Sequence, residues 1–372
     1  MKKLGVFLLI ISALFLPAGC WDNRDLNRRA FVTAIGLDAA DDEKNTCKVS
    51  FEIIRPALLN TINQQGQAST IRTVTAGNID MGMQQLQTTI PRVLALTHMR
   101  VVVIGEKMAR QVNFKDIADY IEKNPEVARR VHVMFVQGGE AQDILKIKPQ
   151  FAMYVAKELI DLTKIEPSIA LARANPFSGL IRDLRATGGR GFGERITLSD
   201  NGKTIALNGG AVFNKWKVTG WLNAAETKNA NWIVGEAGTK VEGNLGQGKY
   251  TYLCQRHSAS IKPVIANGQL SYKIKFKSDG MITQEQNQQL DLTKPSSLNK
   301  LEKVFNQIIT KNIKSAVDKS QKELGIDYLG FGKALEKSNP EYYKKLDWEK
   351  TFPSVPVNIE VKTGISMVSL SR

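Results

Sequence analysis

The sequence is poor in the residues that build most catalytic and metal sites. It holds three cysteines and three histidines in 372 residues. The histidines, His98, His132 and His257, stand far apart without a metal-ligand spacing, and no Gly-x-Ser-x-Gly nucleophile motif occurs. Carboxylates distant in sequence can still meet in a fold, so a carboxylate pair stays open. Nothing specific indicates catalysis, and we expect no enzyme, no metal centre and no bound cofactor.

Long apolar runs and paired cysteines are also missing. After the N-terminal segment no continuous apolar run approaches the about 20 residues that a membrane span takes, and the run Val101–Ile104 suits a buried strand. Cys47 and Cys254 make no metal spacing and lie in what we predict to be different domains. We therefore expect two free, buried thiols. A disulfide between them is the alternative for an exported chain.

Acidic residues are fewer than basic residues. The chain has 51 lysines and arginines against 36 acidic residues, a formal net charge of +15. This balance favours anionic partners, of which lipid headgroups and acidic loops of a membrane partner are the nearest for a membrane-bound chain. Nucleic acid is the other usual partner of a basic chain. The export signal described next argues against it.

The N-terminus has the layout of a secretory signal peptide. Two lysines precede the apolar run Leu4–Leu16, and small residues then lead to Cys20. We predict that residues 1–19 are removed and that the Cys20 thiol carries a diacylglycerol as the first mature residue. Pro17 stands where a branched apolar residue is more usual, and an ordinary cleaved signal with an incidental cysteine is the alternative. Two acyl chains anchor a protein in a bilayer far more stably than one. We therefore expect the folded part of the mature chain to be tethered to the outer, extracytoplasmic face of a membrane.

Hydrophobic periodicity predicts a mixed α/β (α+β) fold in three domains, with mixed, largely antiparallel sheets flanked by helices. Residues 20–138 alternate strands with amphipathic helices, residues 139–205 are more helical, and residues 206–372 combine a sheet with a long helix over 298–324. The predicted strands are 30–37, 47–54, 70–75, 101–104, 131–136, 194–198, 211–213, 217–221, 259–266, 270–277 and 357–361. Residues 60–69 are predicted to form a mobile loop.

One predicted hairpin carries a candidate interaction face. Asn267-Gly268 is a strong turn signal, and in the strand that follows apolar residues alternate with Lys273, Lys275 and Lys277. We expect the long helix to pack on the apolar face. The lysine face is a candidate contact for lipid or for an acidic partner; the alternative is a solvated face that discourages edge pairing.

Two glycine-rich stretches imitate phosphate-binding loops. Gly243–Lys249 matches the glycine and lysine positions of a P-loop, but Tyr250 replaces the Ser or Thr that holds Mg²⁺, and strand-like sequence follows. Gly188–Gly193 has neither a preceding strand nor a following helix start. We interpret the first stretch as a loop and the second as a flexible connector.

Several short patterns coincide in order and spacing over essentially the full length. They are Gly19-Cys20-Trp21-Asp22, Gly210-Ala211-Val212-Phe213 with Gly220-Trp221-Leu222, Leu329-Gly330-Phe331-Gly332, Asn339-Pro340-Glu341-Tyr342-Tyr343, and Phe352-Pro353-Ser354-Val355-Pro356-Val357. Together they resemble the Ger(x)C family of spore germination lipoproteins. The aromatic residues of these patterns suit either core anchors or binding hot spots.

The resemblance implies the C subunit of a nutrient germinant receptor, held on the inner membrane of an endospore beside two integral membrane subunits, A and B. It implies a three-domain mixed α/β architecture, no enzymatic activity, and lipid attachment at Cys20. A different hypothesis is a solute-binding lipoprotein of a transporter, which predicts two similar parallel-sheet lobes around a ligand cleft. A secreted hydrolase lacks any assembled motif.

Overall fold

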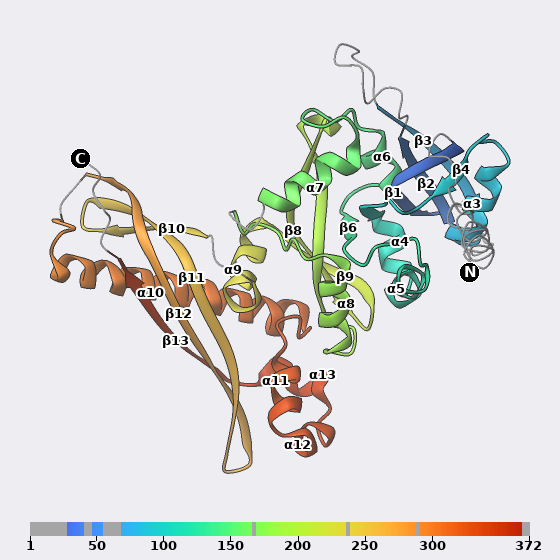
Figure 1. Ribbon diagram of the computed structural model, residues 1–372. Helices are drawn as coiled ribbons and strands as arrows, with labels where there is room; N and C mark the ends of the chain where they lie inside the picture. The colour runs from blue at the N-terminus through green and yellow to red at the C-terminus, as the bar shows by residue number, and fades with distance from the viewer. Residues whose placement is uncertain are drawn as a thin grey trace, which may run out of the picture.

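The computed structural model describes residues 28–40, 47–54, 68–165, 169–235, 239–287 and 290–366. The predicted signal peptide, Cys20 and most of the predicted loop 60–69 lie outside the described residues. The described chain forms one sheet of nine strands and one of four, with helices packed on both (Figure 1). The mixed α/β fold predicted from periodicity is confirmed.

The nine-stranded sheet has the order β3-β2-β1-β5-β6-β7-β8-β9, with β4 beside β1. Its strands are β1 (Arg29–Ala39), β2 (Cys47–Ile54), β3 (Ser69–Ala76), β4 (Val93–Ala95), β5 (Val101–Ile104), β6 (His132–Val136), β7 (Gly191–Ser199), β8 (Thr204–Asn214) and β9 (Lys217–Leu222). The central strands β1, β5, β6 and β7 are parallel, and antiparallel strands extend both edges. All four residues of β5 are buried, as expected for a strand covered on both faces.

Helices cover both faces of this sheet. The core of one face lies under α3 (Ile79–Gln87), α4 (Glu106–Gln111), α5 (Phe114–Lys123) and α8 (Phe177–Arg185). The other core lies under α6 (Ala141–Lys146) and α7 (Val155–Ile165). A further helix, α9 (Ala224–Val234), follows β9 and leads towards the second sheet.

Buried carboxylates fix two of these helices to the sheet. Asp38 at the end of β1 accepts from the backbone N–H of Ala141, at 2.6 Å, and of Gln142 at the start of α6. Glu52 of β2 accepts from the N–H groups of the first two residues of α7, at 2.7 and 3.0 Å. The first N–H groups of a helix have no partner within the helix, so a carboxylate from the sheet satisfies them.

The four-stranded sheet has the order β10-β11-β12-β13. It consists of β10 (Lys240–Leu245), β11 (Gly248–Ala266), β12 (Gln269–Gln286) and β13 (Val357–Ile365), so the predicted hairpin strands are the distal parts of much longer ones. The hairpin turn is at Asn267 and Gly268, where φ is 51° and 76°, as the sequence predicts. Both free thiols, Cys47 in the first sheet and Cys254 in this one, are buried, which confirms the expectation for them.

The predicted long helix packs on the inner face of this sheet. It is α10 (Pro295–Asp318), which continues as a π-helical turn over Lys319–Leu324 and ends at Gly325. Its Phe305 ring lies 5.2 Å from the ring of Tyr252 in β11, within a core that also holds Ile274 and Phe276. The short helices α11 (Phe331–Ser338), α12 (Pro340–Lys344), α13 (Trp348–Thr351) and the 3₁₀ turn η6 (Phe352–Ser354) lead back to β13.

The strands β8 and β9 join the first sheet. They belong to the stretch 206–372 that the sequence assigns to a C-terminal domain, yet β8 pairs with β7 over residues 191–199 and 204–214. The predicted boundary at 205 thus falls within β8, close to its start, and cuts across a paired strand hairpin. The division into three domains stays a prediction. The two sheets differ in strand number and order, so the described residues do not form the two similar lobes that the transporter hypothesis predicts.

Candidate functional site

The β8–β9 hairpin and the C-terminal segment, which hold several of the described short patterns, meet where the two sheets join. The β8–β9 hairpin supplies one wall, and the segment from the π turn to η6 supplies the other. A Cβ atom on Gly220 of β9 would lie 3.3 Å from Leu324 Cδ2, so glycine at this position lets the π turn approach the sheet closely. Segments more than a hundred residues apart in sequence therefore form one junction.

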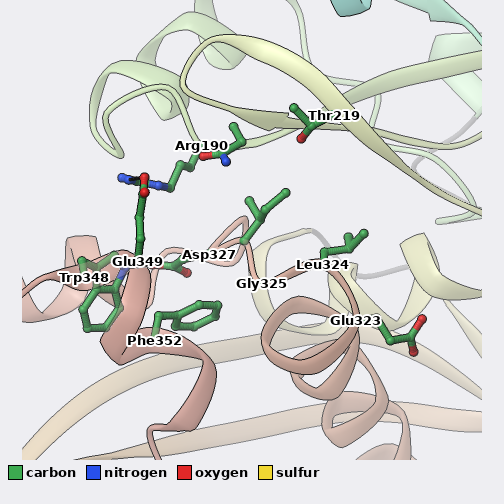
Figure 2. A pocket seen from close by; sticks show the side chains of 11 residues that line it. Arg190, Thr219, Glu323, Leu324, Gly325, Asp327, Trp348, Glu349 and Phe352 are labelled. Carbon is green, nitrogen blue, oxygen red and sulfur yellow. Dashed lines mark hydrogen bonds and ion pairs between the residues drawn. The ribbon is translucent and has the colours of Figure 1, made fainter.

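A pocket of about 300 Å³ opens at this junction (Figure 2). It is lined from the first sheet by Arg190, Asn214 and Thr219, and from the C-terminal segment by Glu323, Leu324, Gly325, Ile326, Asp327, Trp348, Glu349 and Phe352. Apolar side chains from the C-terminal segment form its floor, and charged groups stand at its sides.

Asp327 organises the C-terminal wall. Its carboxylate accepts from the backbone N–H groups of Gly330, Phe331 and Gly332, at 2.9, 2.9 and 2.6 Å, and from Trp348 Nε1 at 3.1 Å. Burial raises the pKa of Asp327, while these four donors act in the opposite direction. The Leu-Gly-Phe-Gly pattern is thus a turn wrapped around one carboxylate at the start of α11.

Ion pairs connect the two walls. Arg190 Nη2 lies 2.9 Å from Glu349 Oε1, and Lys215 Nζ lies 2.9 Å from the same oxygen. Figure 2 shows Glu349 of α13 reaching up to Arg190 at the start of the first sheet's β7 segment. Lys215 and then Arg190 lower the pKa of the Glu349 carboxyl below its ordinary value.

A second ion pair holds the π turn. Lys319 Nζ lies 2.9 Å from Glu226 of α9 and 2.8 Å from Glu323. The pocket's principal polar groups are therefore paired with one another, which suits a fixed joint better than an acid–base centre. No group of three His, Cys, Asp or Glu residues in the described ranges could hold a metal ion.

The three lysines of the predicted interaction face lie on β12 as the sequence indicates. Lys275 and Lys277 are exposed and Lys273 is partly so, while the alternate residues Ile274 and Phe276 are buried. Lys273 forms an ion pair with Glu360 of β13, with an N–O distance of 2.6 Å. This face and the junction pocket are separate parts of the molecule.

The glycine-rich stretches have structural roles. Leu245 pairs with Gly248 at a tight turn between β10 and β11, with Gly246 at a φ of 61°, so the stretch resembling a P-loop is a hairpin turn. In the second stretch the Gly189 N–H donates to the carbonyl of Leu184 and caps α8 before β7 begins. The first stretch is predicted as a loop after a helix, but it is the end of one strand, a tight turn and the start of the next strand. The second is an ordered helix end.

The aromatic residues of the patterns differ in exposure. Phe331 is fully buried and packs against Tyr272, with ring centroids 5.0 Å apart, so it is a core anchor. Trp221 is partly buried and donates from Nε1 to Glu106 at 3.1 Å. Tyr342 of α12 donates to the carbonyl of Gly268 at the hairpin tip.

One buried pair has no signal in the sequence. His132 Nδ1 of β6 lies 2.6 Å from Glu194 Oε1 of β7, because these parallel strands are neighbours. The two residues are 62 positions apart, and only the strand order brings them together.

No helix among the described residues has the length and apolar character needed to cross a bilayer.

Comparison with known proteins agrees with this architecture. Residues 22–192 match the family model described as spore germination protein N-terminal domain, and residues 208–368 match that described as spore germination B3/GerAC like, C-terminal. The crystal structure of the GerBC protein is similar in fold, with a TM-score of 0.57 at 19% identity, covering 89% of this chain and 96% of that one.

Curated relatives extend the similarity to the full length. Spore germination protein B3 of Bacillus subtilis is 24% identical over 98% of both chains. Spore germination protein KC of the same organism is 25% identical over 99% of this chain and 96% of its own. Together these matches identify a two-sheet protein of the spore germination class. The chain belongs to the Ger(x)C family.

Proposed function

We propose that this chain is a non-enzymatic, membrane-tethered subunit of a spore nutrient germinant receptor, acting with integral membrane A and B subunits to trigger germination. The observation that carries the proposal is the full-length similarity to spore germination proteins. The junction between the two sheets supports a non-enzymatic role, because its charged side chains are paired with each other.

The tether in this proposal is a diacylglycerol on Cys20, on the extracytoplasmic side of the spore inner membrane. Tethering raises the effective concentration at the membrane to roughly millimolar, so weak contacts with the A and B subunits are sufficient to form a complex. The proposal needs no cofactor beyond the acyl chains and no nucleic-acid partner.

The function can be tested by deletion and co-purification in the spore-forming host. Spores without the chain are expected to lose the response to at least one nutrient, and an affinity-tagged copy is expected to restore it and to bring down two integral membrane subunits from detergent-solubilised membranes. An unchanged response to every nutrient tested, with no membrane subunit recovered, would contradict the proposal.

Calorimetry of the purified chain against amino acids and sugars separates this function from solute binding. Under the receptor-subunit proposal the chain alone needs no micromolar affinity for a nutrient. Micromolar binding of one of these solutes by the isolated chain would support the transporter hypothesis.

A further inference from the structure

The outer face of the four-stranded sheet concentrates positive charge. Six basic side chains lie on the part of this face between Arg256 and the hairpin turn, and we refer to them as the cationic face: Arg256 and Lys262 on β11, Lys273, Lys275 and Lys277 on β12, and Lys362 on β13. Five of the six are exposed and Lys273 is half-buried. The residues that alternate with them point into the core under α10, so the two faces of the sheet differ sharply in chemistry.

The strand register places like charges side by side. Lys262 lies directly opposite Lys273 across the antiparallel pair, and Lys277 is in register with Lys362 of the parallel neighbour. Like charges at directly opposed positions destabilise a sheet. This arrangement therefore costs folding stability, and binding to an anionic surface would offset that cost.

Two carboxylates on this face offset part of the charge. Asp279 is in register with Arg256, and Glu360 pairs with Lys273. Lys273 lowers the pKa of Glu360, and Lys275 and Lys277 add smaller contributions of the same sign, so all three lysines act on one region of the surface. Six basic groups against two acidic ones leave the face strongly cationic.

The end of the same hairpin is apolar and exposed. Val264 and Ile265 are 44% and 39% exposed, next to the Asn267-Gly268 turn. Figure 1 shows β11 and β12 crossing α10 and extending beyond it to this tip, near α12. The hydrogen bond from Tyr342 to the carbonyl of Gly268 gives the tip a defined position. Val264 is on the cationic face, two residues from Lys262.

We propose that the cationic face and the Val264–Ile265 tip together bind the anionic headgroup layer of a lipid bilayer, as a second membrane contact in addition to the N-terminal tether. Lysines near exposed apolar side chains suit the membrane interface, where phosphate groups receive the charge and the acyl boundary receives the apolar tip. An acidic protein segment would match the lysines but would leave the tip without a partner. The inference rests on the proposed membrane location.

Vesicle binding by the unlipidated chain tests this contact. The chain starting at Trp21 contains every described residue, and it lacks Cys20, so the lipid tether cannot contribute. We expect it to bind vesicles of equal phosphatidylglycerol and phosphatidylcholine at low salt, and to release them as salt is raised. Vesicles of phosphatidylcholine alone should not bind it.

Matched variants test whether binding depends on the cationic face or only on the net charge of the chain. Each lysine near an anionic surface contributes about a fivefold change in affinity, so K273Q/K275Q/K277Q is expected to bind on the order of 100-fold more weakly. The control K300Q/K303Q/K311Q removes the same charge from exposed positions of α10, on the opposite side of the sheet, and should bind nearly as the wild type does. V264S/I265S should weaken binding without altering the net charge.

A variant that is expected to bind more tightly excludes misfolding as the explanation of a change in binding. E360Q removes one of the two carboxylates and frees Lys273 from its ion pair, so it is expected to bind anionic vesicles more tightly. Equal losses in the hairpin and α10 variants, or no binding to anionic vesicles by the wild type, would overturn the proposal. Binding to acidic peptides but not to vesicles would assign the face to a protein partner instead.

These outcomes are independent of the germination assay. A chain that fails to bind vesicles can still be a receptor subunit held by its tether, whereas one that binds them can still lack any effect on germination. The two proposals therefore fail separately.

Discussion

Asp327 shows how one buried side chain fixes a large part of the C-terminal segment. All four groups that face its carboxylate are N–H donors: three from the backbone of residues 330–332 and one from the Trp348 indole. Only an acceptor suits such a site. The D327N variant directs an amide donor against some of these N–H groups and leaves them unsatisfied.

We therefore expect D327N to lower the free energy of unfolding by about 3 kcal/mol, measured by urea titration. W348F keeps the aromatic packing but removes one donor, and should cost about 1 kcal/mol. A D327N chain as stable as the wild type would show that the carboxylate does not hold this turn.

Glu349 is the residue through which acid weakens the junction. Its pKa is lowered by Lys215 and Arg190, so the folded chain binds a proton there less readily than the unfolded chain, whose ordinary value is 4.5. The contribution of the pair to stability is complete above pH 4.5 and is lost as pH falls through the lower, folded pKa.

The melting temperature should thus differ between wild type and E349Q at about pH 6, and the difference should disappear on acidification. The corresponding difference in the free energy of unfolding should be less than about 1 kcal/mol, because the ion pair is partly exposed and solvent screens it. E341Q, which removes an exposed carboxylate paired within one helical turn, is the control. A difference that grows as the pH falls would contradict this assignment.

At the scale of elements, the end of α10 depends on one left-handed residue. The π turn stops at Gly325, where φ is 63° and a Cβ atom would meet nothing within 4 Å. The left-handed backbone conformation is therefore the only source of an energetic cost when residue 325 carries a side chain. We expect G325A to lose about 1 kcal/mol in urea unfolding.

Gly77 offers the matched comparison. It also has open space around its Cβ position, and its φ lies outside the left-handed region. G77A is expected to be neutral or slightly stabilising, because alanine restricts the unfolded chain. Equal destabilisation by both substitutions would mean that the left-handed conformation is not the cause.

Elements with strong local signals were predictable from the sequence. The Asn267-Gly268 turn, the buried strand at 101–104 and the long helix that starts at Pro295 each depend on residues within one short window. Helix α8 was missed although Phe177, Leu180, Ile181 and Leu184 have helical spacing and are all buried. That spacing would have been sufficient to find it.

Long-range pairing was not predictable in the same way. The sequence indicates a hairpin at 211–221, but only the backbone partners of β7 show that this hairpin continues the first sheet. The junction pocket likewise unites Arg190 with Glu349, 159 positions apart. The lysine alternation on β12 was visible in the sequence, whereas the opposed Lys262 and Lys362 depend on strand register.

At the scale of the whole molecule, the account assigns contacts to three regions. We propose that the N-terminal cysteine holds the chain to the membrane, that the outer face of the second sheet meets the headgroups, and that the paired charges of the junction keep the two sheets in a fixed relation. Under these proposals the protein acts through surfaces that it presents to neighbours, which agrees with its similarity to spore germination proteins.

The most direct test of this account is the chemical state and location of Cys20 in spores. Mass spectrometry of the chain from spore inner membranes should find a mature N-terminus at Cys20 carrying a diacylglycerol, and a C20A variant should leave the membrane fraction and reduce the germination response. An unacylated chain in the soluble fraction of wild-type spores that germinate normally would contradict the account.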